Sequence, residues 1–183
     1  MATTRADENG GPAARGWLFG PETPLGLAAA LIACAADQAL KLWLIFGFDL
    51  ANRGLVRILP TIDFVLTWNR GISYGLFQQD TAFGRWVLVA FKLAAVVALW
   101  VWLARAGSRR TAVALGLIIG GALGNVIDRL VYGAVADFVL FHVETAAWQF
   151  RWYVFNLADA AIVVGVALLL YEALFPPRAA KAP

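Results

Sequence analysis

Residues 111–132 read TAVALGLIIGGALGNVIDRLVY, an apolar stretch that is rich in glycine and ends among polar side chains. It is long enough to cross the hydrocarbon core of a bilayer as a helix, which takes about 20 residues. Its glycines fall close to one helical turn apart, a spacing that permits close helix packing in lipid: Gly116, Gly120, Gly121 and Gly124. The stretch therefore predicts a membrane-spanning helix that packs tightly against its neighbours.

Three further apolar runs of similar length occur at about Leu25–Phe46, Phe83–Ala104 and Val154–Phe175. Hydrophobic residues make up 61% of the 183-residue chain and charged residues only 15%, whereas a soluble domain is about 45–50% apolar. These figures exclude an ordinary water-soluble domain. The sequence predicts an all-α integral membrane protein with four transmembrane helices.

The orientation follows from the basic residues. The connection Arg105–Arg110 carries three arginines and is short, so the positive-inside bias places it in the cytoplasm. With an even number of spans, both ends of the chain fall on that same side. We expect one membrane domain over residues 25–175, flanked by polar cytoplasmic tails at residues 1–24 and 176–183. The net charge of +3 comes from residues that flank the apolar runs, so no nucleic-acid partner is expected.

Two longer connections, about Gly47–Ala82 and Gly133–Tyr153, then lie outside. Residues Val56–Trp68 are rich in β-branched and aromatic side chains, which favour strands. We expect a small extracytoplasmic β-sheet and an interfacial loop or helix. Tryptophan and tyrosine in these connections suit the membrane interface.

Polar residues from three spans and one loop converge at the outer end of the bundle: Asp37, Lys41, Asn125, Asp128, Arg129, Asp137, Asn156 and Asp159. Ionisable groups at membrane depth usually line a bundle interior or a cavity. We interpret Asp37–Lys41 and Asp128–Arg129 as structural ion pairs. Asp137 and Asp159 have no obvious counter-ion, so we interpret them as functional.

Several kinds of catalysis are excluded by composition. The only serines are Ser73 and Ser108, the single cysteine Cys34 lies within a span, and no zinc-binding motif is present. The single histidine, His142, is expected to be solvated at the interface. Two neighbouring carboxyl groups that share one proton could instead activate water and polarise a peptide carbonyl. No metal and no cofactor is expected.

Five motifs in order resemble the lipoprotein signal peptidases of bacteria, also called signal peptidase II. They are Asp37-Gln-x-x-Lys41, Asn69-x-Gly71-x-x-x-Gly75, Gly120-Gly-Ala-Leu-Gly-Asn-x-x-Asp-Arg129, Gly133-x-Val-x-Asp-Phe138 and Phe155-Asn-x-Ala-Asp-x-Ala-Ile162. The resemblance covers roughly residues 35–162. Leu40, where the family usually has serine or threonine, and Ser73-Tyr74 depart from its pattern.

The resemblance implies an aspartic endopeptidase that cleaves diacylglyceryl-modified prolipoproteins just before the lipidated cysteine. It implies a dyad of Asp137 and Asp159. Substrate-binding or supporting roles would fall to Asn69, Gly71, Asn125, Arg129 and Asn156, with Asp37, Lys41 and Asp128 as structural support. It also implies a monomer in the bacterial cytoplasmic (inner) membrane, in contact with membrane lipids, an active site on the extracytoplasmic face, and inhibition by globomycin.

Two other readings compete with the peptidase. A proton-coupled transporter would also place carboxylates in a membrane, but it would need them spread through the bilayer depth. Lys92 and Glu172 are the only charges toward the inner half of the second and fourth runs, so no relay is evident. A non-catalytic assembly factor would use the aspartates only to hold helices together.

Overall fold

The computed structural model describes residues 18–71 and 82–175. Four helices in these ranges are long and apolar enough to cross a membrane. They are α1 (Thr23–Leu42, continued by a π-helical turn at Trp43–Gly47), α3 (Ala82–Leu103), α4 (Arg109–Val131) and α5 (Leu157–Leu174). Gly75 of the predicted outer-loop motif lies outside the described residues. So do residues 1–17 and 176–183 of the predicted tails.

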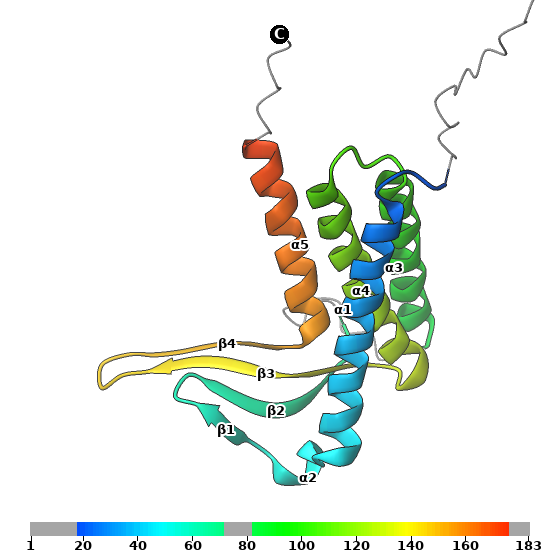
Figure 1. The fold of residues 1–183 in the computed structure, drawn as a ribbon. Helices are drawn as coiled ribbons and strands as arrows, with labels where there is room; N and C mark the ends of the chain where they lie inside the picture. Colours follow the sequence, from blue (N-terminus) through cyan, green and yellow to red (C-terminus); the bar gives the residue numbers. More distant parts are fainter. Residues whose placement is uncertain (1–17, 72–81, 176–183) are drawn as a thin grey trace, which may run out of the picture.

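The helices stand side by side, and a four-stranded sheet crosses one end of the bundle (Figure 1). All its strands are antiparallel, in the order β1 (Val56–Leu59), β2 (Ile62–Asn69), β3 (Val135–Glu144) and β4 (Gln149–Phe155). A short helix, α2 (Leu50–Arg53), joins the end of α1 to the sheet. The predicted fold, a four-helix membrane protein with a small sheet, is confirmed.

The start of α5 differs from its prediction. The apolar run begins at about Val154, but the helix begins at Leu157 because Val154 and Phe155 pair with β3 as part of β4. Asn156 caps the helix: its side chain accepts from Asp159 N, and the Asp159 side chain accepts from Asn156 N. This reciprocal cap fixes the first turn of α5.

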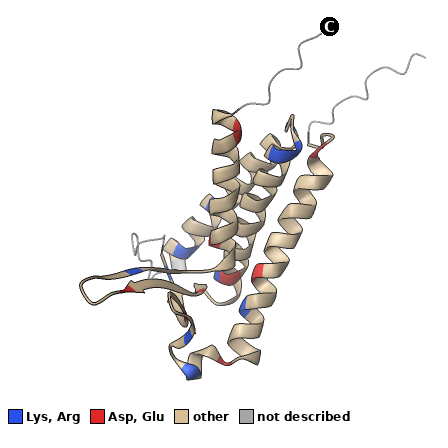
Figure 2. Ribbon diagram, turned by 60° about the vertical axis from the view of Figure 1, so that its left-hand side comes forward, with Lys and Arg blue, Asp and Glu red and all other residues tan. Residues whose placement is uncertain are grey.

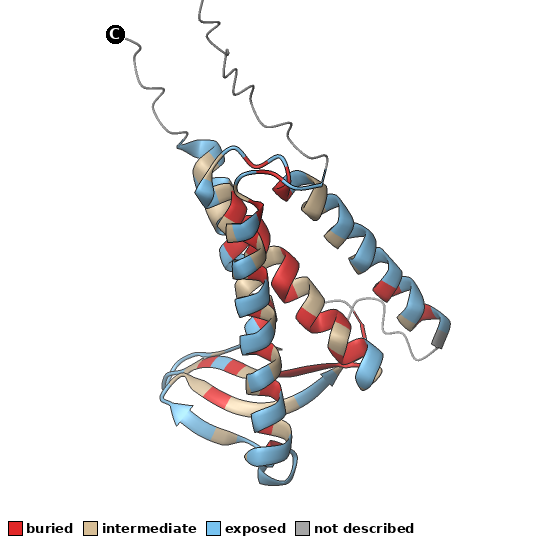
Figure 3. Cartoon of the chain, turned by 45° about the vertical axis from the view of Figure 1, so that its right-hand side comes forward, coloured by how far each residue is buried: buried red, intermediate tan, exposed pale blue. Residues whose placement is uncertain are grey.

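Helix α4 is the centre of the bundle. Over its most apolar 18 residues, 61% of the residues are buried, whereas the corresponding value for α5 is 11%. Figure 3 shows the buried residues concentrated on this central helix. Its glycines allow the close packing. A Cβ on Gly120 would strike the backbone of Ala30 in α1, and one on Gly121 would strike the backbone of Ala158 in α5.

Charged residues are sparse along the helices and gather at their ends and in the sheet (Figure 2). Large apolar side chains instead cover the outer helix surfaces, such as Phe91 on α3 and Leu170 on α5, which are 72% and 58% exposed. Exposed apolar side chains on this scale are unfavourable in water, so we expect these helix surfaces to contact lipid.

Candidate active site

Asp137 and Asp159 line the same cavity, at the junction of the helix bundle and the sheet. Asp137 lies on β3, and Asp159 lies in the first turn of α5. The cavity has a volume of about 1170 Å³. Its walls come from β2, β3, β4, α3 and α5, and they include Asn69, Gly71, Lys92, Trp152 and Val163.

Amide side chains connect the two carboxyl groups. Asn156 Nδ2 donates to Asp137 Oδ1 at 2.6 Å and to Asn125 Oδ1 at 3.0 Å. Asn125 Nδ2 in turn donates to Asp159 Oδ1 at 2.8 Å. Asn69 Nδ2 donates to the second oxygen of Asp137 at 3.1 Å. Both carboxyl groups are therefore held in fixed orientations by neutral donors, and neither forms an ion pair with a basic residue of the described segments.

The surroundings of Asp137 favour its neutral form. Only 3% of the residue is exposed, and this burial, followed by the charge of Asp159, raises the pKa of Asp137 to about 6. Two hydrogen bonds, from Asn69 and Asn156, oppose this rise in pKa. A carboxyl group of this kind can hold a proton close to neutral pH, as a general acid must.

Lys41 forms a buried ion triad beneath the dyad. Its Nζ lies 2.7 Å from Asp37 Oδ2 and 2.8 Å from Asp128 Oδ2. The predicted pair Asp37–Lys41 is present. The predicted pair of Asp128 with Arg129 is wrong, since Asp128 binds Lys41 across the α1–α4 interface instead.

Arg129 binds two backbone carbonyls instead of Asp128. Its guanidinium donates to Gly71 O at 2.8 Å and to Asn125 O at 3.1 Å. It is 5% exposed. Arg129 thus fixes the backbone that follows β2 against α4, next to the dyad.

All of the predicted site residues that lie within the described ranges come together at this site. The structure adds two further residues, Gln38 and Lys92. Gln38 Nε2 donates to Asp128 Oδ1 at 2.9 Å and to Gly124 O at 3.1 Å, so it links α1 to α4. Lys92 lines the cavity from α3. An ionisable residue in the middle of a span was the signal for Lys92.

His142 is not solvated, contrary to expectation. It is 3% exposed and its Nε2 lies 3.0 Å from Asp63 Oδ2, within the sheet. The neighbouring strands β2 and β4 enclose it, which a lone histidine in a sequence does not reveal. It does not line the cavity of the dyad.

Comparison with known proteins decides the family. The family model for signal peptidase II matches residues 29–175. The chain belongs to the signal peptidase II family. A lipoprotein signal peptidase of Nitrobacter hamburgensis is 58% identical over 88% of this chain and 99% of its own length. The protein of that name from Methylorubrum extorquens is 61% identical over 84% of this chain and 88% of its own length.

Two solved structures share the fold. Both are described as bacterial membrane enzymes. One has a TM-score of 0.68 at 20% identity over 88% of this chain and 99% of its own. The other has a TM-score of 0.64 at 22% identity over 87% and 95%. Signal peptidase II enzymes are aspartic peptidases of lipoprotein precursors, so family membership supports the peptidase and not the transporter.

Proposed function

We propose that this signal peptidase II removes the signal peptide from diacylglyceryl-modified prolipoproteins, cutting before the lipidated cysteine, with Asp137 and Asp159 as its catalytic dyad. One observation carries the assignment of the dyad. Both carboxyl groups line the same cavity and are joined through Asn156 and Asn125. No other pair of carboxylates among the described residues lines that cavity.

The reaction requires one proton on the dyad. The ionised carboxylate takes a proton from water as the water oxygen attacks the peptide carbonyl, while the protonated carboxyl group donates to the carbonyl oxygen. The tetrahedral intermediate then breaks its C–N bond, and the departing amine receives a proton from the dyad. The shared proton belongs to the pair, so neither role is fixed to one residue.

The remaining site residues position these groups. Asn69 and Asn156 hold Asp137, and Asn125 holds Asp159. Because neutral amides make these contacts, they orient the carboxyl groups without supplying a full counter-charge. Arg129 donates to the carbonyl of Gly71, and the Gly71 N–H donates to Asn69 Oδ1, so this residue is held in place beside the cavity.

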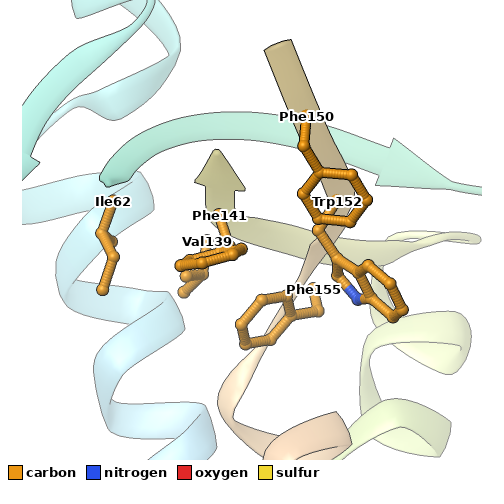
Figure 4. Close-up of a pocket in the computed structure, with 6 residues that line it drawn as sticks. All are labelled: Ile62, Val139, Phe141, Phe150, Trp152 and Phe155. Atoms are coloured by element: carbon orange, nitrogen blue, oxygen red, sulfur yellow. The ribbon is translucent and has the colours of Figure 1, made fainter. Parts of the chain in front are cut away.

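An apolar cavity beside the dyad supports a substrate that carries lipid. Six side chains from β2, β3 and β4 line it, in a volume of about 420 Å³ (Figure 4): Ile62, Val139, Phe141, Phe150, Trp152 and Phe155. Trp152 and Phe155 also line the cavity of the dyad. The apolar cavity therefore adjoins the cavity of the dyad, where the lipidated cysteine of the substrate would lie.

The proposed setting is the bacterial cytoplasmic (inner) membrane, with residues 25–175 as one membrane domain acting as a monomer. The α3–α4 connection, with its arginines, lies at the bundle end opposite the sheet (Figure 1). The positive-inside bias then places both chain ends in the cytoplasm and the dyad at the extracytoplasmic face.

The test is cleavage of diacylglyceryl-modified precursor by the purified protein. Asp137→Asn and Asp159→Asn should each lower kcat at least about 100-fold, the lower range for loss of an acid–base group. Membrane insertion should not change. Near-normal turnover by either variant would exclude this dyad. Rescue of cell function by these variants would favour a non-catalytic assembly factor.

A further inference from the structure

Lys92 is a charged group on the catalytic cavity that the dyad mechanism does not use. It is the eleventh residue of α3, whose first residue is Ala82, so it lies about 15 Å along the helix at 1.5 Å per residue. Its side chain lines the cavity that holds Asp137 and Asp159. It forms no ion pair or hydrogen bond with another described residue.

The cavity extends from the dyad along the helices α3 and α5. Its deeper wall on α5 is apolar and consists of Ala160, Ile162, Val163 and Val164. Val164 lies five residues beyond Asp159, or about 8 Å along the helix. Lys92 on α3 contributes to the same cavity. The other basic residue of the described lining, Arg70, is exposed at the end of β2.

An ammonium group at this depth needs acceptors, because an unpaired charge in a low-dielectric region is costly. It can donate three hydrogen bonds. The hydrophobic part of a signal peptide brings no carboxylates, but it does bring backbone carbonyls. The last turn of its helix has unpaired carbonyls and a partial negative charge. The extended segment that leads to the scissile bond has unpaired carbonyls as well.

On these grounds we propose that Lys92 is a substrate-binding residue whose ammonium donates hydrogen bonds to backbone carbonyls of the signal segment just before the scissile bond. This inference rests on the proposed function. The bound segment would lie between α3 and α5, and Lys92 would set how far it enters before its scissile carbonyl meets the dyad. The aliphatic stem of Lys92 suits the apolar wall, and its charged end suits the carbonyls.

The test compares Lys92→Met, Lys92→Gln and Lys92→Arg by steady-state cleavage of diacylglyceryl-modified precursor. Each substitution is also made in an Asp137→Asn background, where the dissociation constant Kd for uncleaved precursor is measured. Lys92→Met should raise KM and Kd about 10-fold or more, the value of a hydrogen bond from a charged donor. Its kcat should stay within about 3-fold. Lys92→Arg should restore binding, and Lys92→Gln should fall between them.

Arg85→Met is the matched control, because Arg85 is a cation on the same helix that does not line the cavity. It should leave KM unchanged. Unchanged KM and Kd in Lys92→Met would overturn the inference. A shifted pH profile of kcat/KM in Lys92→Met, together with an unchanged KM, would also overturn it, because Lys92 would then act on the protonation of the dyad and not on substrate binding. If Lys92→Met does not fold, Lys92→Gln gives the same decision. If the wild-type protein does not cleave the precursor, the proposed function itself fails.

Discussion

Asp128 accepts a hydrogen bond from the backbone N–H of Ala136 at 3.0 Å, and Ala136 immediately precedes Asp137. A matching contact exists on the other side of the site. Asp37 accepts from the backbone N–H of Ala158 at 2.9 Å, and Ala158 immediately precedes Asp159. Lys41 binds both acceptors. One buried ion triad therefore fixes the backbone next to each member of the proposed dyad.

This arrangement predicts a large effect of Lys41→Met. The change leaves two buried carboxylates without a counter-ion, which should lower the free energy of unfolding by about 3–5 kcal/mol. Thermal unfolding in detergent micelles measures the loss. The triple variant Lys41→Met, Asp37→Asn, Asp128→Asn removes all the charges and should recover most of that stability. A triple variant no more stable than Lys41→Met would show that the charges are not the cause.

Asn156 combines two functions that substitution can separate. It caps α5 and also donates to Asp137. Serine is a good N-cap but is too short to keep the amide contact. Asn156→Ser should keep the cap but lose the buried amide contacts with Asp137 and Asn125, and activity should fall at least about 10-fold. Asn156→Ala should lose the same activity and should be about 1 kcal/mol less stable than Asn156→Ser.

Unfolding and cleavage measured on the same two preparations decide this point. Equal activity in Asn156→Ser and the wild-type protein would mean that the contact with Asp137 has no catalytic value. Equal stability of the serine and alanine variants would mean that the cap contributes nothing measurable.

Close packing of α4 predicts that Gly120→Ala destabilises the bundle. The added Cβ would strike the backbone of Ala30, which cannot move aside as a flexible side chain would. Overpacking of this kind costs about 1–3 kcal/mol. Gly107→Ala is the control, since nothing lies within 4 Å of its Cβ. Unfolding temperatures should fall for Gly120→Ala only, and equal values for both variants would contradict the packing argument.

Hydropathy, glycine spacing and the positions of polar residues were enough to predict the four helices and the level at which Asp137 and Asp159 meet. Both features depend on the length and direction of spans, which a sequence carries directly. The partners of Asp128 and His142 were not predictable in the same way. Asp128 has a cation next to it in the chain, but Lys41 on another helix binds it. His142 lies against Asp63 of β2, a strand distant in the sequence, so its burial depends on the sheet order.

The raised pKa of Asp137 predicts how the site responds to pH. Its pKa of about 6 in the folded protein exceeds the ordinary value of about 3.9 in an unfolded chain. Between these two values the folded state binds more protons than the unfolded state, so this group makes stability fall as pH rises from about 4 to about 6. Above about pH 6 the dyad loses its shared proton, so kcat/KM in the wild-type protein should fall as pH increases.

Asp159→Asn tests the cause of that raised pKa. Burial is the larger cause and the charge of Asp159 the second, so removing this charge should lower the pKa of Asp137 without returning it to about 3.9. Carbon-13 NMR of labelled aspartate in micelles follows the titration of Asp137 directly, with Asp137→Asn identifying its signal. An unchanged pKa in Asp159→Asn would mean that the two carboxyl groups are not electrostatically coupled, and a dyad that shares one proton would then be untenable.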